Sequence, residues 1–194
     1  LVPGISGATK IAATGQRTCA LIAEGRVMCW GSEQWGELGN DQTNTNDSSV
    51  APSLVVDDAT GLSISGLKTL SLATDHACGV KGNGQLWCWG WNMLGQTGGS
   101  RTGVQAGAVA YTSADELTPL SDVTQVTVGY QFTCMIRQGD RVWCVGDNLT
   151  GELGDGTTNY ADVPVPQRVV KLEGVSSVVS SYGHTCVSRS SVEV

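Results

Sequence analysis

The sequence predicts an all-β repeat protein, and three observations support that class. In three places a cysteine is followed ten positions later by a second one, at Cys19 and Cys29, Cys78 and Cys88, and Cys134 and Cys144. Glycine accounts for 26 of the 194 residues, about twice its usual share. Helical periodicity is almost absent, and its one short exception, at residues 113–117, is too short to indicate a helix.

The residues around each cysteine pair repeat the same phrase. From Thr18 it reads T-C-A-L-I-A-E-G-R-V-M-C-W-G, and further copies begin at Ala77, Thr133 and Thr185, the last ending before its second cysteine. Successive copies begin 59, 56 and 52 residues apart. Self-similarity at such a period indicates units that bury their cores against their neighbours. We treat the chain as one repeat array with approximate repeats at 1–58, 59–116, 117–165 and a truncated 166–194.

Each phrase predicts a β-hairpin, because apolar and polar residues roughly alternate on both sides of a short glycine-containing stretch. With residues 23–25 as a three-residue loop ending in a left-handed glycine, Cys19 lies opposite Cys29. The second copy fits the same frame. In the third, Gly139 comes one position early, so Asp140 is expected to take the left-handed conformation. Opposed Cβ atoms lie roughly 4.5–5.5 Å apart, which predicts a disulfide within each hairpin.

Zinc binding is the competing interpretation of the cysteines. Structural zinc sites favour two cysteines separated by two to four residues, a spacing that does not occur here, and His76 and His184 are too few to complete several sites. Free buried thiols are a further alternative. Cys186 has no partner in its own copy and is expected to be unpaired. Disulfides at this density indicate an oxidising compartment, so we expect a secreted or cell-surface protein.

The ends of the sequence suggest a piece of a longer polypeptide. The mate of Cys186 would lie two residues beyond Val194, and the start of the chain leads directly into a strand-like run with no signal segment. No stretch approaches the roughly 18 apolar residues of a membrane span. The net charge of −7 disfavours nucleic acid and anionic membranes as partners.

A second phrase follows each hairpin. It reads C-W-G-S-E-Q-W-G-E-L-G-N-D from Cys29, C-W-G-W-N-M-L-G-Q-T-G-G from Cys88 and C-V-G-D-N-L-T-G-E-L-G-D-G-T from Cys144. Together the two phrases resemble the repeat of the regulator of chromosome condensation family over nearly the whole chain, and the version with paired cysteines is similar to extracellular members. The resemblance implies a β-propeller of four-stranded antiparallel blades, here an incomplete ring of about three blades plus a truncated fourth.

The glycines of the second phrase recur at spacings of five and three residues. They are Gly31, Gly36, Gly39, Gly90, Gly95, Gly98, Gly146, Gly151 and Gly154. These positions suit tight bends and close backbone contacts. A phosphate-binding loop would also need a following helix and usually a lysine, and neither is present.

The variable segments 40–58, 99–116 and 155–165 are expected to emerge at one face or rim, where binding residues often lie. Calcium binding is conceivable in the first, which is rich in oxygen-bearing side chains, but no EF-hand spacing occurs and a solvated loop is the plainer interpretation. Asn46 and Asn148 begin glycosylation acceptor patterns.

Large apolar residues outside the expected core alternation are the candidate binding residues. They are Trp35, Trp91, Met93, Tyr111, Tyr130, Phe132 and Tyr182. Those that can be aligned change character from repeat to repeat, which is unexpected for shared core positions, and exposed aromatic residues make good binding anchors. The alternative is that they pack against the inserted loops.

Catalysis has little support in the sequence. His76 and His184 share a repeat position where the family often has histidine, so we expect them to be hydrogen-bonded within a blade. Glu37 and Glu152 recur with the repeat, and no serine lies in a nucleophile-elbow context. We therefore expect no catalytic residue, metal or cofactor.

The function expected is a non-enzymatic extracellular binding or scaffolding module. Its partner would be another protein or copies of itself, without nucleic acid binding or membrane insertion. One alternative is a structural subunit of a surface appendage, sheath or adhesin. Another is an inhibitor of a secreted enzyme such as a β-lactamase, which rests on fold analogy. The resemblance also offers nucleotide exchange on a small GTPase, which the cysteine pairs disfavour.

Overall fold

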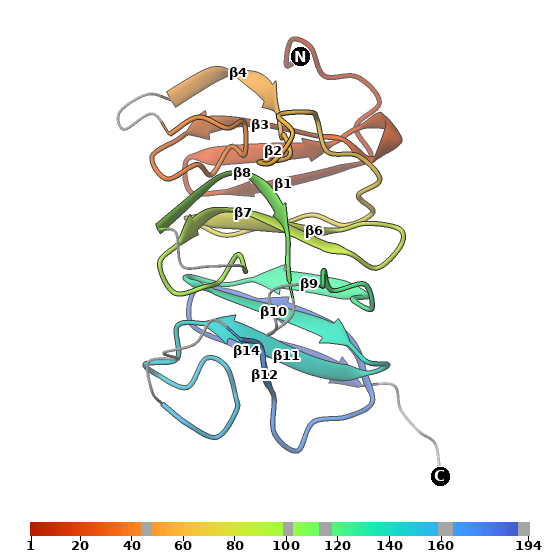
Figure 1. Cartoon of the computed structure of the whole chain (residues 1–194), viewed down its shortest axis with the longest axis vertical. Coiled ribbons are helices and arrows are strands. Elements are labelled where there is room, and N and C mark those ends of the chain that lie inside the picture. Colours follow the sequence, from red (N-terminus) through yellow and green to blue (C-terminus); the bar gives the residue numbers. More distant parts are fainter. Residues whose placement is uncertain (44–47, 99–102, 113–117, 159–164, 190–194) are drawn as a thin grey trace.

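The computed structural model describes residues 1–43, 48–98, 103–112, 118–158 and 165–189. Its strands form antiparallel sheets that follow one another in chain order (Figure 1). The first sheet contains β1 (Lys10–Thr14), β2 (Arg17–Leu21), β3 (Val27–Ser32) and β4 (Ser48–Leu54). The second contains β5 (Ser71–Leu72), β6 (His76–Val80), β7 (Leu86–Asn92) and β8 (Gly103–Ala110). The all-β class is confirmed.

The third sheet contains β9 (Gln125–Val128), β10 (Phe132–Arg137), β11 (Arg141–Gly146) and β12 (Gln167–Arg168). β12 lies just after the repeat boundary expected at residue 165 and pairs with β11. The described part of the fourth sheet is the pair β13 (Val175–Ser180) and β14 (Thr185–Arg189). Within the described residues, the fold is therefore three four-stranded blades followed by a strand pair.

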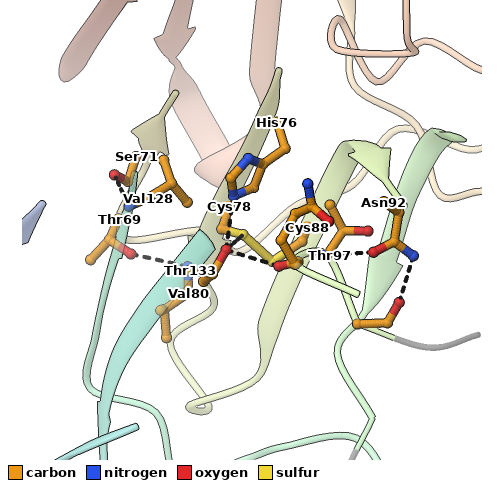
Figure 2. Close-up of a disulfide and its surroundings, with 12 residues drawn as sticks. Thr69, Ser71, His76, Cys78, Val80, Cys88, Asn92, Thr97, Val128 and Thr133 are labelled. Carbon is orange, nitrogen blue, oxygen red and sulfur yellow. Dashed lines mark hydrogen bonds between the residues drawn. A yellow bond between two sulfur atoms is a disulfide. The ribbon is translucent and has the colours of Figure 1, made fainter. Parts of the chain in front are cut away.

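The central strand pairs have the predicted register. In all three hairpins the cysteines are directly opposed and form disulfides, Cys19–Cys29, Cys78–Cys88 and Cys134–Cys144. Cys186 is free and exposed. The predicted disulfides are confirmed, and each joins the second and third strands of one blade. Figure 2 shows the disulfide between Cys78 and Cys88.

The hairpin loops follow the prediction in part. Gly84 has the expected left-handed backbone, with a φ of 82°, and in the first loop Glu24 shares that conformation with Gly25. The expectation for Asp140 is wrong, because Gln138 and Gly139 carry the positive φ angles of the third loop. Glycine accepts that backbone without a Cβ clash. The Asp140 carboxylate instead accepts a hydrogen bond from the backbone N–H of Gly174 at 2.9 Å.

Each hairpin tip is bonded to the chain as it enters the next blade. The carbonyl of Gly25 accepts from the N–H of Leu67, and the carbonyl of Gly84 accepts from that of Val123, both at 3.1 Å. Three hydrophobic cores lie between successive blades rather than within them. Each blade is therefore stabilised by its neighbours, as expected of a repeat array.

Removing one disulfide should measurably lower the free energy of unfolding. Each disulfide closes a short loop, and the chain-entropy model gives about 2.5–3 kcal/mol for a loop of this size. The double variant Cys78→Ala/Cys88→Ala should therefore lose stability by that amount in a urea titration. The control is Cys186→Ser, a change to an exposed free thiol, which should stay within about 0.5 kcal/mol of the wild type. An equal loss of stability in the double variant and in Cys186→Ser would contradict a stabilising role of the disulfide.

Candidate binding site

The turns that join the first two strands of each blade lie at one end of the sheets. Their residues include Gly15 and Gln16, Thr74 and Asp75, Tyr130 and Gln131, and Tyr182 in the fourth blade. We call this end the turn face. Turns from three blades line a cleft of about 590 Å³, together with Arg17, Ser32, Gln34, Trp35, Glu37 and Trp91. The repeat thus places corresponding residues of successive blades around one cavity.

Four of the seven candidate aromatic or sulfur-bearing residues lie at the turn face. Trp35, Trp91 and Tyr130 line the cleft. Tyr182 stacks on Tyr130 with ring centroids 4.6 Å apart, and both rings border a neighbouring hollow of about 310 Å³. Trp35 and Tyr182 are well exposed, at 42% and 70%.

The other three candidates lie elsewhere. Met93 is exposed but does not line the cleft. Tyr111 and Phe132 are completely buried, so expecting them on a binding surface is wrong. Tyr111 packs over the bare backbone of Gly98 between the second and third blades, and the Phe132 ring fills the space that a side chain at Gly129 would need. Both are therefore core residues.

Arg17 is a buried charge at the base of the cleft, and the repeat pattern alone gave no sign of it. Its Nη1 lies 3.3 Å from Oε1 of Glu37, and its Nη2 donates to the carbonyls of Ala73 and Thr74 in the next blade. Burial lowers the pKa of Arg17, while the nearby carboxylates oppose that shift. Its repeat position is the one that His76 occupies in the second blade, so a nitrogen-bearing side chain joins neighbouring blades at both places.

Glu37 fixes the loop that carries Trp35. Its Oε2 accepts hydrogen bonds from the backbone N–H groups of Gln34 at 2.7 Å and Trp35 at 2.6 Å. Gln96 and Glu152 make the corresponding contact with the N–H groups two residues before them. The recurrence of Glu37 and Glu152 is thereby explained by loop structure.

His76 links the second and third blades (Figure 2). Its Nδ1 lies 2.9 Å from Oδ1 of Asp75, and its Nε2 lies 2.8 Å from Oγ1 of Thr133 on β10. The Thr133 hydroxyl has one hydrogen, which it donates to the carbonyl of Gln96 at 2.8 Å. Nε2 of His76 is therefore the donor in its bond to the Thr133 oxygen. The expected hydrogen bond within the blade is confirmed for His76 by Asp75, and the bond to Thr133 adds a contact with the next blade.

The His76 network resembles a catalytic triad in composition but not in accessibility. Neither His76 nor Thr133 exposes any surface, and the Thr133 hydroxyl already donates to a carbonyl. A nucleophile needs a free path to its substrate and a base that can take its proton. The geometry therefore supports a structural tie between blades. His184, at the same repeat position, is exposed.

Glu33 is a buried carboxylate near the cleft, and it gives a testable pH effect. Its Oε2 accepts from Asn40 at 3.3 Å, whereas its Oε1 has no hydrogen-bond partner among the described residues. Burial raises the pKa of Glu33; the Asn40 hydrogen bond opposes the shift and the Glu37 charge adds to it. A raised carboxyl pKa means that ionised Glu33 destabilises the folded state.

Glu33→Gln should therefore be more stable than the wild type at pH 7. The contribution of Glu33 to stability falls as the pH rises above the unfolded-state glutamate pKa of about 4.3. The advantage of the variant should accordingly vanish at about pH 4. Urea midpoints at the two pH values test this, with exposed Glu24→Gln as the control that should show no such difference. A pH-independent effect of Glu33→Gln would contradict the proposed cause.

Of the two asparagines in glycosylation patterns, the structure describes Asn148 but not Asn46. Asn148 is 1% exposed, and its side-chain nitrogen donates to Oγ1 of Thr157 at 3.0 Å. Its amide is therefore engaged inside the loop and is not presented for modification. Asn46 lies outside the described residues, as does part of the 40–58 segment considered for calcium.

The described part of the chain contains neither a group of metal-ligating side chains nor a helix that could span a membrane. No three histidine, cysteine, aspartate or glutamate side chains within the described ranges gather as metal ligands would. Across the same ranges, no helix has the length and apolar character needed to cross a bilayer.

Antiparallel four-stranded sheets that share cores, with a cleft formed by their first turns, define an incomplete β-propeller. Two family models of the regulator of chromosome condensation (RCC1) repeat match residues 123–152 and 140–188. The chain is thus an RCC1-like repeat protein, as its repeated phrases predict.

Known relatives match this chain over part of their own length. The human E3 ubiquitin-protein ligase HERC2 is 28% identical over 183 residues, which cover 90% of this chain and 3% of the ligase. The ultraviolet-B receptor UVR8 of Arabidopsis thaliana is 24% identical, over 87% of this chain and 36% of the receptor. Prp20p of Saccharomyces cerevisiae is similar in structure, with a TM-score of 0.75 and 16% identity, over 98% of this chain and 46% of Prp20p. These likenesses support the fold.

Proposed function

We propose that this chain is a non-enzymatic protein-binding module that acts outside the cell, secreted or on the cell surface, and that its turn face contacts the partner. The observation that carries the proposal is the gathering of Trp35, Trp91, Tyr130 and Tyr182 at one end of the blades. Aromatic residues dominate the energetic centres of protein interfaces. The rigid, disulfide-stapled blades hold these side chains in place before binding, which lowers the ordering cost of association.

The compartment and the kind of ligand have separate support. Three disulfides fit an oxidising environment. Prp20p binds Gsp1p and histones, so a protein ligand has a precedent on this fold. The His76–Thr133 pair is sealed inside the chain, which favours binding over catalysis.

Affinity capture from the culture medium of the source cells, with matched variants, tests this function. The bait would be the purified chain, its Trp35→Ala/Tyr182→Ala variant, or Leu62→Ala as a control at an exposed apolar residue that does not line the cleft. We expect a protein that the wild type and Leu62→Ala retain and the double variant loses. Calorimetry with that purified protein should then show at least about a tenfold weaker affinity for the double variant, given the usual size of hot-spot effects. Equal binding by all three baits would contradict a partner surface at the turn face.

A structural subunit is the second candidate, and β14 favours it. Within the described residues β14 pairs with β13 alone, most of its residues are exposed, and it carries the free Cys186. An exposed strand edge can add a strand from another chain. Sedimentation of the wild type and Cys186→Ser with and without reductant tests assembly. Concentration-dependent oligomers that persist in both would support strand pairing, whereas a monomer throughout would exclude this role.

A further inference from the structure

The charged groups that line the cleft are already engaged within the chain. Arg17 pairs with Glu37 and donates to two carbonyls of the next blade. The second oxygen of Glu37 accepts two backbone N–H groups, and Oδ1 of Asp75 is bonded to His76. A charged ligand would therefore find few free counter-charges in the cleft. A neutral ligand avoids the cost of removing a charge from water without compensation.

The uncommitted polar groups of the cleft are mostly side-chain amides. Gln16, Gln34 and Gln131 line it, and none makes a side-chain hydrogen bond to another described residue. The Ser32 hydroxyl likewise makes no hydrogen bond to another described residue. An amide offers donors and an acceptor side by side, and so does a pair of neighbouring hydroxyl groups. Gln16 and Gln131 occupy the same repeat position, on the turns of the first and third blades.

The rest of the cleft wall is aromatic. Trp35, Trp91 and Tyr130 supply apolar ring surfaces beside these amides. The local field also disfavours anions, because burial raises the pKa of the Tyr130 hydroxyl and the neighbouring Tyr182, Asp75 and Asp147 add to that shift. A fitting ligand is neutral, rich in hydroxyl groups and apolar on one face.

We propose that the cleft binds a short neutral oligosaccharide. A sugar ring presents C–H groups on its face and hydroxyl groups around its edge, so it can stack on Trp91 or Tyr130 while Gln131 and Gln16 bond to its hydroxyl groups. The volume of about 590 Å³ lies within the usual range of small-ligand sites. This goes beyond the proposed function, since a saccharide could be free or attached to a protein partner.

Calorimetric titration of the purified chain with cellotriose, maltotriose, mannotriose and chitotriose tests the proposal. We expect at least one to bind at millimolar concentration or below. Trp91→Ala should weaken that binding at least tenfold and Trp91→Phe less, because stacking on a second aromatic ring is retained. Gln131→Ala should weaken it by roughly two- to tenfold, the usual range for a hydrogen bond. Met93→Ala, outside the cleft, should bind as the wild type.

Three results would overturn the proposal. The first is the absence of binding by all four trisaccharides at several millimolar, with folding verified by the circular dichroism of the same samples. The second is unchanged binding in Trp91→Ala and Gln131→Ala. The third is tighter binding of a sulfated form of the bound trisaccharide, which would show a site for anions. The capture experiment with Trp35→Ala/Tyr182→Ala is read independently, so failure here leaves the protein-binding function to its own test.

Discussion

Gly90→Ala should destabilise the chain by about 2–5 kcal/mol, the combined cost expected of left-handed strain and a backbone clash. Gly90 has a φ of 107°, and a Cβ there would lie 2.5 Å from the carbonyl oxygen of Asp75 and 2.7 Å from Cα of His76. Both contacts are backbone atoms, one in the β5–β6 turn and one in the first residue of β6. The Trp91 N–H holds the turn through its bond to the Asp75 carbonyl. The turn therefore cannot move away without losing the cleft geometry.

Gly61→Ala is the matched control for Gly90→Ala. Gly61 also has a positive φ, of 67°, but a Cβ there would meet nothing within 4 Å. Its substitution should cost only the left-handed strain, about 1–2 kcal/mol. Urea titrations of both variants measure the difference, and equal losses would show that the close approach at Gly90 is not what requires glycine.

Trp89→Ala should cost about 3–5 kcal/mol, the range for truncating a large buried aromatic residue. Trp89 is fully buried between the first and second blades, and its Nε1 donates to the carbonyl of Glu37 at 3.0 Å. Removal leaves both a cavity and an unsatisfied carbonyl. Because Glu37 holds the Trp35 loop, the variant should also disturb the cleft.

Two further tryptophan variants separate the effect of burial from the effect of the lost hydrogen bond. Trp89→Phe keeps most of the volume and should cost about 1–3 kcal/mol, mainly for the carbonyl left without a donor. Trp35→Ala removes the same side chain from a position 42% exposed and should cost less than about 1 kcal/mol. Thermal or urea unfolding measures all three. A loss for Trp35→Ala as large as that for Trp89→Ala would place Trp35 in the core.

Contacts within one hairpin were predictable from the sequence, because they depend on local spacing. The opposed cysteines follow from strand alternation and a three-residue loop. The conformation of the third loop did not follow, since it depends on which of Gln138, Gly139 and Asp140 bonds to the next blade. Repeat spacing alone does not determine that choice.

Contacts between blades were the part that sequence reasoning missed. Phe132 differs from its repeat equivalents Arg17, His76 and His184, which suggested exposure. Its ring fills the space left by Gly129, where the other repeats have Thr14, Ala73 and Ser181. The large ring and the glycine compensate for each other, so variation at a repeat position is compatible with burial. The Arg17–Glu37 pair and the His76–Thr133 bond likewise emerge only when neighbouring loops and blades are placed together.

Peptide mapping by mass spectrometry without reduction tests the central claim most directly. That claim is that a disulfide joins the second and third strands in each of the three four-stranded blades. The chain should be isolated from an oxidising compartment, alkylated and digested. We predict three linked peptide pairs, Cys19–Cys29, Cys78–Cys88 and Cys134–Cys144, with Cys186 alkylated. A link between blades, such as Cys19 to Cys78, or alkylation of all seven cysteines in the folded protein, would contradict it.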